Sequence, residues 1–344
     1  MNLEEFLYSI SSASCISGRE GAAEIIFGAV KVFSPDACFD RLGSIVAPVI
    51  PPKEGGEHLL IDAHIDEIGF VVTNIDDEGF LRVGKVGGPD LRILLGHEVT
   101  VFGSEPLFGL FCCRPPHLSN AEDYKKAPSV DELAIDIGRS KESAATLVSP
   151  GDFVTLRCEP ARLKNGLITG KALDNRAGVA AVLRTLELLQ GKKLNIGLTA
   201  VLSISEELGE RGAKTAAFGA APTQAIVIDT SFAMTPDSPR EKCGELFKGP
   251  MIGVSPVLSH EITSQLFALA REKGIPYQTE VMSWDTGTNS DAISVTRSGV
   301  STGLLSIPLR YMHTACEVVA IQDIENTAQL AAAYILSIGG EEHV

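Results

Sequence analysis

The second half of the chain alternates between helical and strand-like patterns of apolar residues. Five apolar side chains recur at helical spacing within residues 175–189, which predicts an amphipathic helix. Further helices are expected at residues 262–272, stopped by Gly274, and at residues 323–336. Buried strands are predicted at residues 198–204 and 225–228, and further strands near residues 279–282 and at residues 303–307. This alternation predicts an α/β fold with a mostly parallel central sheet flanked by helices.

The region from residue 68 to residue 166 has a different pattern. Its short β-rich runs are separated by glycine and proline, and their close spacing predicts a small β barrel or sandwich. The first sixty residues predict two helices, with a turn at residues 17–21 between them, and then a strand at residues 59–61. We therefore expect one α/β domain built from residues 1–67 and 167–344, interrupted by a β domain at residues 68–166.

Length and charge narrow the possible classes of function. At 344 residues the chain exceeds the size at which a single core stops growing, so two domains are expected. An apolar share of 44% with 21% charged residues is ordinary for an enzyme and excludes a disordered or fibrous chain. The net charge of −15 opposes binding to nucleic acid and to anionic membrane surfaces.

The expected location is the cytoplasm. The acidic start of the chain lacks the basic and apolar segments of a secretory signal. No apolar stretch approaches the ~20 residues that a membrane span needs. The cysteines number seven, without Cys-x-x-Cys spacing, which is typical of thiols in a reducing compartment rather than of disulfides or a zinc knuckle.

Five acidic or imidazole side chains each follow a short apolar run: His64, Asp174, Glu207, Asp229 and His313. In open α/β sheets reactive groups gather outside the carboxyl ends of the strands, so residues distant in sequence can share one crevice. Two imidazoles and three carboxylates can hold two divalent metal ions, with zinc as the first expectation and cobalt or manganese as alternatives. The remaining histidines lack such a setting and are expected to be structural or surface residues.

Each of these positions also has an ordinary structural interpretation. Strand period two puts Asp62, His64 and Asp66 on one face, where a carboxylate can fix the imidazole tautomer. Taken alone, His64 is more typical of a satisfied structural histidine at a strand end. Asp174 begins a helix, where aspartate is most often an N-cap; the functional alternative is a carboxylate that bridges two ions roughly 3.5–4 Å apart.

Glu206 and Glu207 come directly after a predicted buried strand. Consecutive side chains point in different directions, so Glu207 can bind a metal while Glu206 faces a substrate. Metal-assisted hydrolysis uses such a pair, because a carboxylate must take a proton from the activated water and deliver it to the leaving amine. The alternative, which the sequence leaves equally open, is a solvated acidic helix start favoured by the helix dipole.

The same residues resemble, over most of the chain, the tetrahedral-aminopeptidase family of dinuclear metallopeptidases. Its members include glutamyl and deblocking aminopeptidases, some of them labelled cellulase M or endoglucanase. The resemblance rests on the segments Ser17-Gly18-Arg19-Glu20, Asp62-Ala63-His64-Ile65-Asp66-Glu67-Ile68-Gly69-Phe70, Lys171-Ala172-Leu173-Asp174-Asn175-Arg176, Glu206-Glu207-Leu208-Gly209-Glu210-Arg211-Gly212-Ala213, Thr286-Gly287-Thr288-Asn289 and Arg310-Tyr311-Met312-His313-Thr314. The chain departs from the family pattern at Ser205, where glutamine is usual, and at Ala315-Cys316, where a pair with proline is more common.

The resemblance implies a role for each matching residue. His64, Asp174 and Asp229 would hold one ion, and Asp174, Glu207 and His313 the other. Glu206 would be the general base and acid, and Asp66 would support His64. The sheet would be zinc-exopeptidase-like and the β domain a PDZ-like dimerisation domain. Dimers in that family assemble into hollow tetrahedral dodecamers that admit only unfolded peptides, so a homo-oligomer is expected.

The leading hypothesis is a metal-dependent aminopeptidase that removes the N-terminal residue of short peptides. A related dinuclear amidase, carboxypeptidase or deacylase would use the same ligands with another pocket. A glucanase is disfavoured because sugar-binding grooves are usually rich in aromatic residues, and only 6% of this chain is aromatic. The sequence gives no support to a non-catalytic protein that keeps the fold but has lost the reaction, because every predicted metal ligand is present. The preferred N-terminal side chain stays open; residues 232–251 and 284–291 are the expected specificity loops.

Overall fold

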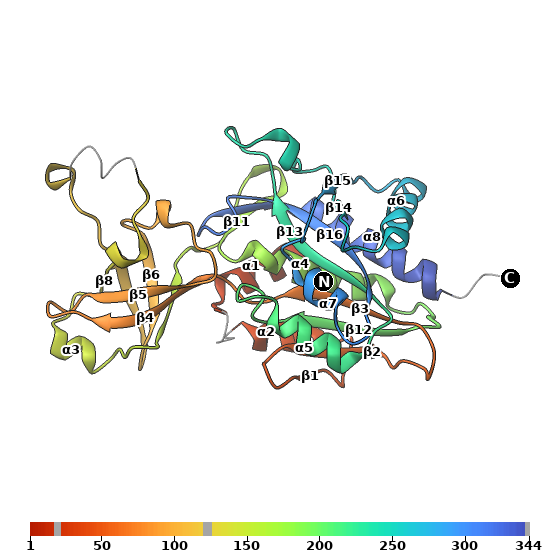
Figure 1. The fold of residues 1–344 in the computed structure, drawn as a ribbon, viewed down its shortest axis with the longest axis horizontal. Coiled ribbons are helices and arrows are strands. Elements are labelled where there is room, and N and C mark those ends of the chain that lie inside the picture. The colour runs from red at the N-terminus through yellow and green to blue at the C-terminus, as the bar shows by residue number, and fades with distance from the viewer. Residues whose placement is uncertain (17–21, 120–125, 341–344) are drawn as a thin grey trace.

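The computed structural model describes residues 1–16, 22–119 and 126–340. Figure 1 shows two parts, a β barrel on the left and a larger α/β body on the right. The expected turn at residues 17–21, and with it the family-like segment at residues 17–20, lies outside the described residues. None of the described helices has both the length and the apolar character needed to cross a bilayer.

One mixed sheet runs through the α/β body. Of its eleven strands, counted over the described residues, nine follow the path β1 (Cys38–Phe39), β2 (Ile45–Ile50), β12 (Gly197–Ser203), β3 (His58–His64), β13 (Gln224–Phe232), β16 (Ser301–Arg310), β17 (Glu317–Ala320), β11 (Leu167–Gly170) and β10 (Ala161–Arg162). Off this path, β14 (Met251–Val254) pairs with β16, and β15 (Gln278–Val281) pairs with β14.

The predicted α/β class is confirmed, with one refinement. The four central strands β12, β3, β13 and β16 are parallel to one another. Both ends of the sheet are antiparallel, at β1–β2–β12 on one side and at β16–β17–β11–β10 on the other. The carboxyl ends of the parallel strands therefore share one edge, where a crevice is expected.

Helices cover both faces of the sheet, which explains the uninterrupted apolar runs. On β3, Leu59 and Ile61 pack into the core beneath one set of helices, whereas Leu60 packs into the core on the opposite face. The first face carries α1 (Leu3–Ser12), α2 (Ala23–Val30), α4 (Leu173–Leu189), α6 (His260–Lys273) and α8 (Ile321–Gly339). The opposite face carries α5 (Arg211–Ala220) and α7 (Asn289–Ser294).

The β-rich region forms a closed barrel, not a sandwich. Its strands are β4 (Gly69–Ile75), β5 (Leu81–Val86), β8 (Ile135–Asp136), β7 (Pro106–Phe111), β6 (Glu98–Phe102) and β9 (Phe153–Leu156), and α3 (Lys141–Ala145) lies beside them. The barrel has a core of its own, in which the rings of Phe70 and Phe111 meet edge to face at 5.1 Å. Closure of the barrel pairs backbone N–H and C=O groups that the edge strands of an open sheet would leave unpaired.

Candidate active site

The five predicted ligands line one cavity of about 580 Å³, together with Glu206. β3 ends at His64, and the loop after β12 supplies Glu206 and Glu207. Asp174 lies at the start of α4, and His313 lies in the turn between β16 and β17. Asp229 lies inside β13 rather than at its end, but pairing of β13 with β3 stops at Val227, so the aspartate still projects beyond the neighbouring strand.

Asp174 stands between the two imidazoles. Its Oδ1 is 3.3 Å from Nε2 of His64, and its Oδ2 is 3.4 Å from Nε2 of His313. Asp229 approaches the same nitrogen of His64 at 3.6 Å, and Glu207 approaches that of His313 at 3.4 Å. Two groups of three potential ligand atoms result, each within a span of 4.8 Å, and they share Asp174.

The helix cap expected of Asp174 is supplied by its neighbour. The side-chain oxygen of Asn175 accepts the backbone N–H of Gly178 at 3.0 Å, which is the hydrogen bond of an N-cap residue. Asp174 itself has a non-helical backbone, with φ −79° and ψ 105°. Its carboxylate is therefore free to face the two histidines.

Backbone carbonyls orient both imidazoles. Nδ1 of His64 lies 3.1 Å from the carbonyl of Asp66, and Nδ1 of His313 lies 2.9 Å from the carbonyl of Gly88. A carbonyl can only accept, so each Nδ1 carries a proton and each Nε2 faces the cavity, where it would bind a metal ion as the neutral imidazole. Gly88 follows β5, so the barrel contributes directly to the geometry of this site.

Asp66 acts mainly on the glutamate loop. Its two carboxylate oxygens accept the backbone N–H groups of Glu206 at 3.1 Å and of Glu207 at 3.3 Å. The same carboxylate is 3.4 Å from Nδ1 of His64. Asp62, the other carboxylate beside this histidine, instead accepts a hydrogen bond from Asn289 at 2.7 Å. Asp66 thus connects His64 to the loop that carries both glutamates.

The cavity holds more negative charge than its side chains can balance. Neither lysine nor arginine is among the described residues that line it. Burial, with the nearby Asp229 carboxylate adding to it, raises the pKa of Glu206 to about 9. Burial of His313 opposes its charged form, but hydrogen bonds with Asp174 and Glu207 outweigh it and raise the pKa of His313 to about 11. Clustered carboxylates and imidazoles in such a setting fit divalent cations, which would supply the missing charge.

Sequence reasoning missed one buried carboxylate in this site. Glu317, 2% exposed, accepts the backbone N–H of Asp174 at 3.1 Å and that of His313 at 2.9 Å. It therefore ties the shared ligand to one of the two imidazoles. The available signal was a carboxylate at the head of the apolar run Val318-Val319-Ala320, four residues after His313.

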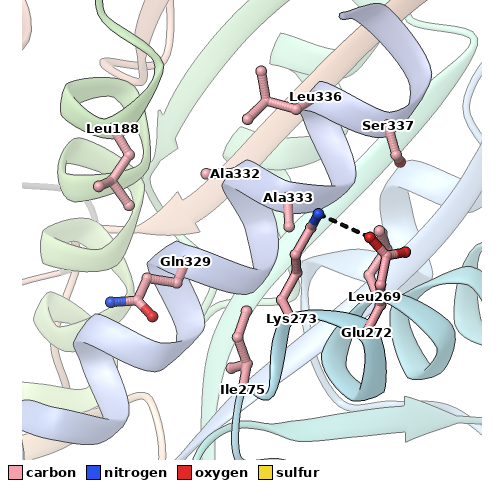
Figure 2. Close-up of a pocket in the computed structure, with 10 residues that line it drawn as sticks. All are labelled: Leu188, Leu269, Glu272, Lys273, Ile275, Gln329, Ala332, Ala333, Leu336 and Ser337. Atoms are coloured by element: carbon pink, nitrogen blue, oxygen red, sulfur yellow. Dashed lines mark hydrogen bonds and ion pairs between the residues drawn. The ribbon is translucent and has the colours of Figure 1, made fainter.

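A second hollow, of about 590 Å³, lies among α4, α6 and α8 (Figure 2). Most of its lining is apolar, as with Leu188, Leu269 and Leu336, and an ion pair joins Lys273 to Glu272 at 2.8 Å. Neither of the two ligand groups found in the described chain lies there. The cavity at the sheet edge is therefore the candidate active site.

Comparison with known proteins agrees with this geometry. The model of the M42 glutamyl aminopeptidase family matches residues 43–330. A lysyl aminopeptidase of Pyrococcus furiosus is 29% identical over 96% of both chains. The structure of an aminopeptidase from Desulfurococcus kamchatkensis superposes with a TM-score of 0.89 at 32% identity, over 99% of each chain. The TET1 peptidase of Pyrococcus horikoshii, which can assemble into a tetrahedron or a large octahedral shell, superposes with a TM-score of 0.84 at 32% identity, over 96% of this chain and 98% of that one.

Proposed function

We propose, because this chain belongs to the M42 glutamyl aminopeptidase family, that it is a dinuclear metalloaminopeptidase that removes the N-terminal residue of short peptides. The observation that carries the proposal is the shared position of Asp174. One of its oxygens faces the group with His64 and Asp229, and the other faces the group with Glu207 and His313.

The donor set supports a pair of divalent ions. His64, Asp174 and Asp229 would hold one, and Asp174, Glu207 and His313 the other. Neutral imidazole nitrogen and carboxylate oxygen suit zinc, cobalt and manganese, with zinc as the first candidate. When bound, such a pair supplies Lewis-acid chemistry, which lowers the pKa of water and polarises a carbonyl oxygen.

Glu206 is the proposed proton carrier. Its Oε2 lies 3.9 Å from Nε2 of His64, so its carboxylate is beside the ligand atoms without belonging to either group of three. It would take a proton from the attacking water and pass it to the amine nitrogen as the C–N bond breaks. Asp66 would hold Glu206 and Glu207 in place through their backbone N–H groups.

Dependence on a free α-amine in the substrate distinguishes an aminopeptidase from the alternative enzymes. We would measure hydrolysis of a panel of aminoacyl amides, free and N-acetylated, before and after dialysis against a chelator. An aminopeptidase cleaves only the free amides, and only with metal present. Preferred cleavage of acetylated substrates would instead identify a deacylase or another amidase. Cleavage of β-glucan without peptide hydrolysis would identify a glucanase.

We further propose that the chain forms a closed homo-oligomer through the domain at residues 68–166. The independent core of the barrel and its exposed Phe108 and Leu110 support a role as an assembly module. Light scattering would distinguish a dimer from a dodecamer, and Phe108→Ser together with Leu110→Ser should shift the protein to smaller species. The cytoplasmic location stays a prediction of the sequence.

A further inference from the structure

One wall of the active-site cavity contains polar groups that the proposed hydrolysis does not use. Thr230 and Ser231 belong to β13, directly after the ligand Asp229, and Glu280 belongs to β15. The hydroxyl of Ser231 donates a hydrogen bond to Oε1 of Glu280. We call these three residues the Glu280 wall.

Two atoms of the Glu280 wall lack partners. The hydroxyl of Thr230, a residue that is only 6% exposed, and Oε2 of Glu280 are both buried, and the described chain offers neither a hydrogen bond. Buried polar atoms of this kind are uncommon, because each has lost its hydrogen bonds to water. Both residues line the cavity, so a ligand that enters there can supply the missing partner.

The charge of the cavity indicates which ligand fits. Two divalent ions would balance the four carboxylates that surround the candidate metal site. Glu280 and Asp285 would then remain as additional acidic side chains, with neither lysine nor arginine among the described lining residues to balance them. An ammonium or guanidinium group has N–H donors for a carboxylate and a hydroxyl, and it carries the required charge.

We propose that the Glu280 wall is a specificity site for peptides whose N-terminal residue is lysine or arginine. This inference rests on the proposed aminopeptidase function, since it assigns the side chain of the residue that is removed. Because Thr230 is adjacent to Asp229, a substrate whose scissile carbonyl lies at the metal site has its first side chain next to this wall. Ser231 holds one oxygen of Glu280, and the other oxygen receives the cationic group.

A competing role for Glu280 is recognition of the free α-amine, which every substrate shares. The two roles differ in a measurable way. A side-chain site affects lysyl and arginyl substrates alone, and it does so mainly through KM. An α-amine site affects lysyl, leucyl and glutamyl substrates to the same extent.

The test compares kcat and KM for lysyl, leucyl and glutamyl amides in the metal-loaded protein and in Glu280→Gln. The matched control is Glu272→Gln, which removes the same charge from the separate hollow in Figure 2. We expect Glu280→Gln to lower kcat/KM for the lysyl amide by about 10- to 100-fold, as for a lost charge-assisted hydrogen bond. The leucyl amide should change by no more than about twofold, and Ser231→Ala should cause a smaller loss in the same direction.

The outcomes separate the two proposals. If the wild-type protein cleaves none of the amides, the aminopeptidase function itself fails. If it cleaves leucyl or glutamyl amides better than lysyl amides, the function stands and the specificity inference is overturned. Equal losses on all three amides in Glu280→Gln also overturn it, because they assign Glu280 to the α-amine. A selective loss on lysyl amides supports it.

Discussion

The carboxylate of Glu317 accepts the backbone N–H of Asp174 at 3.1 Å, across 143 positions of sequence. Its second oxygen accepts the N–H of His313 at 2.9 Å. The contact with Asp174 is buried and that with His313 is part-buried, and both partners are proposed ligands. Glu317 thus fixes the distance between the carboxylate shared by the two ligand groups and the imidazole of one of them.

Replacing Glu317 with glutamine should weaken metal binding without unfolding the protein. The amide oxygen can accept only one of the two N–H groups, and the NH₂ group then faces the other donor. Loss of a residue that orients ligands typically weakens metal affinity by roughly 10- to 100-fold. Competition with a metal-sensitive dye would measure the metal affinity of the variant. Glu261→Gln, on the exposed face of α6, is the control. Equal affinities in both variants would remove Glu317 from this role.

The Glu206→Gln variant should bind metal as the wild type does but turn over substrate far more slowly. Glutamine cannot carry the proton, and general acid–base catalysis contributes roughly 10²- to 10⁴-fold. Glu210→Gln is the matched control, because Glu210 follows in the same loop but does not line the cavity. Steady-state kinetics and metal content would be measured on both. Wild-type turnover in Glu206→Gln would exclude it as the base.

The sequence was informative about His64, Glu207, Asp229 and His313 because they lie on, or shortly after, strands that are buried on both faces. Apolar runs locate such strands, and the parallel order brings their carboxyl ends together at one edge. The sequence was less informative about contacts that form only because a turn brings two distant segments together. Glu317 reaches Asp174 only because β17 folds back beside β16, and Gly88 reaches His313 from the barrel. Glu280, on β15 beside β14, lies outside both loops in which specificity was expected.

A methyl group at Gly88 should disturb the candidate metal site from the barrel side. A Cβ there would lie 3.1 Å from Nδ1 of His313, closer than an ordinary contact, so the imidazole must shift. Because the carbonyl of Gly88 orients this ring, Gly88→Ala should lower both metal affinity and kcat. Gly219→Ala, on α5 with open space around the position, is the control and should leave both unchanged. An unaltered kcat in Gly88→Ala would contradict this contribution of the barrel.

The stability of the fold should fall in mild acid partly because of His58. Burial lowers the pKa of His58, whose Nε2 lies 2.9 Å from the hydroxyl of Thr199. Below about pH 6.5 the unfolded chain protonates this imidazole while the folded chain does not, so protons favour unfolding. Urea unfolding at pH 8 and pH 5.5 would compare wild type with His58→Gln. The wild type should lose more stability than the variant; equal losses would contradict this assignment.

Removal of metal should destabilise the protein as well as inactivate it. Asp174, Glu206, Glu207 and Asp229 converge on one cavity, where cations relieve their repulsion only in the folded chain. The chelated protein should therefore melt at a lower temperature, and zinc, cobalt or manganese should restore the melting temperature at two ions per chain.

The ligand groups predict how the metal content changes with substitution. Asp174→Asn should abolish binding of both ions, because each group of three includes Asp174, whereas Asp229→Asn should leave one. Metal analysis by mass spectrometry and thermal melts of the same samples would measure this. If Asp174→Asn and Asp229→Asn retain the same number of ions, the carboxylate does not bridge two sites, and its contacts with both imidazoles are structural.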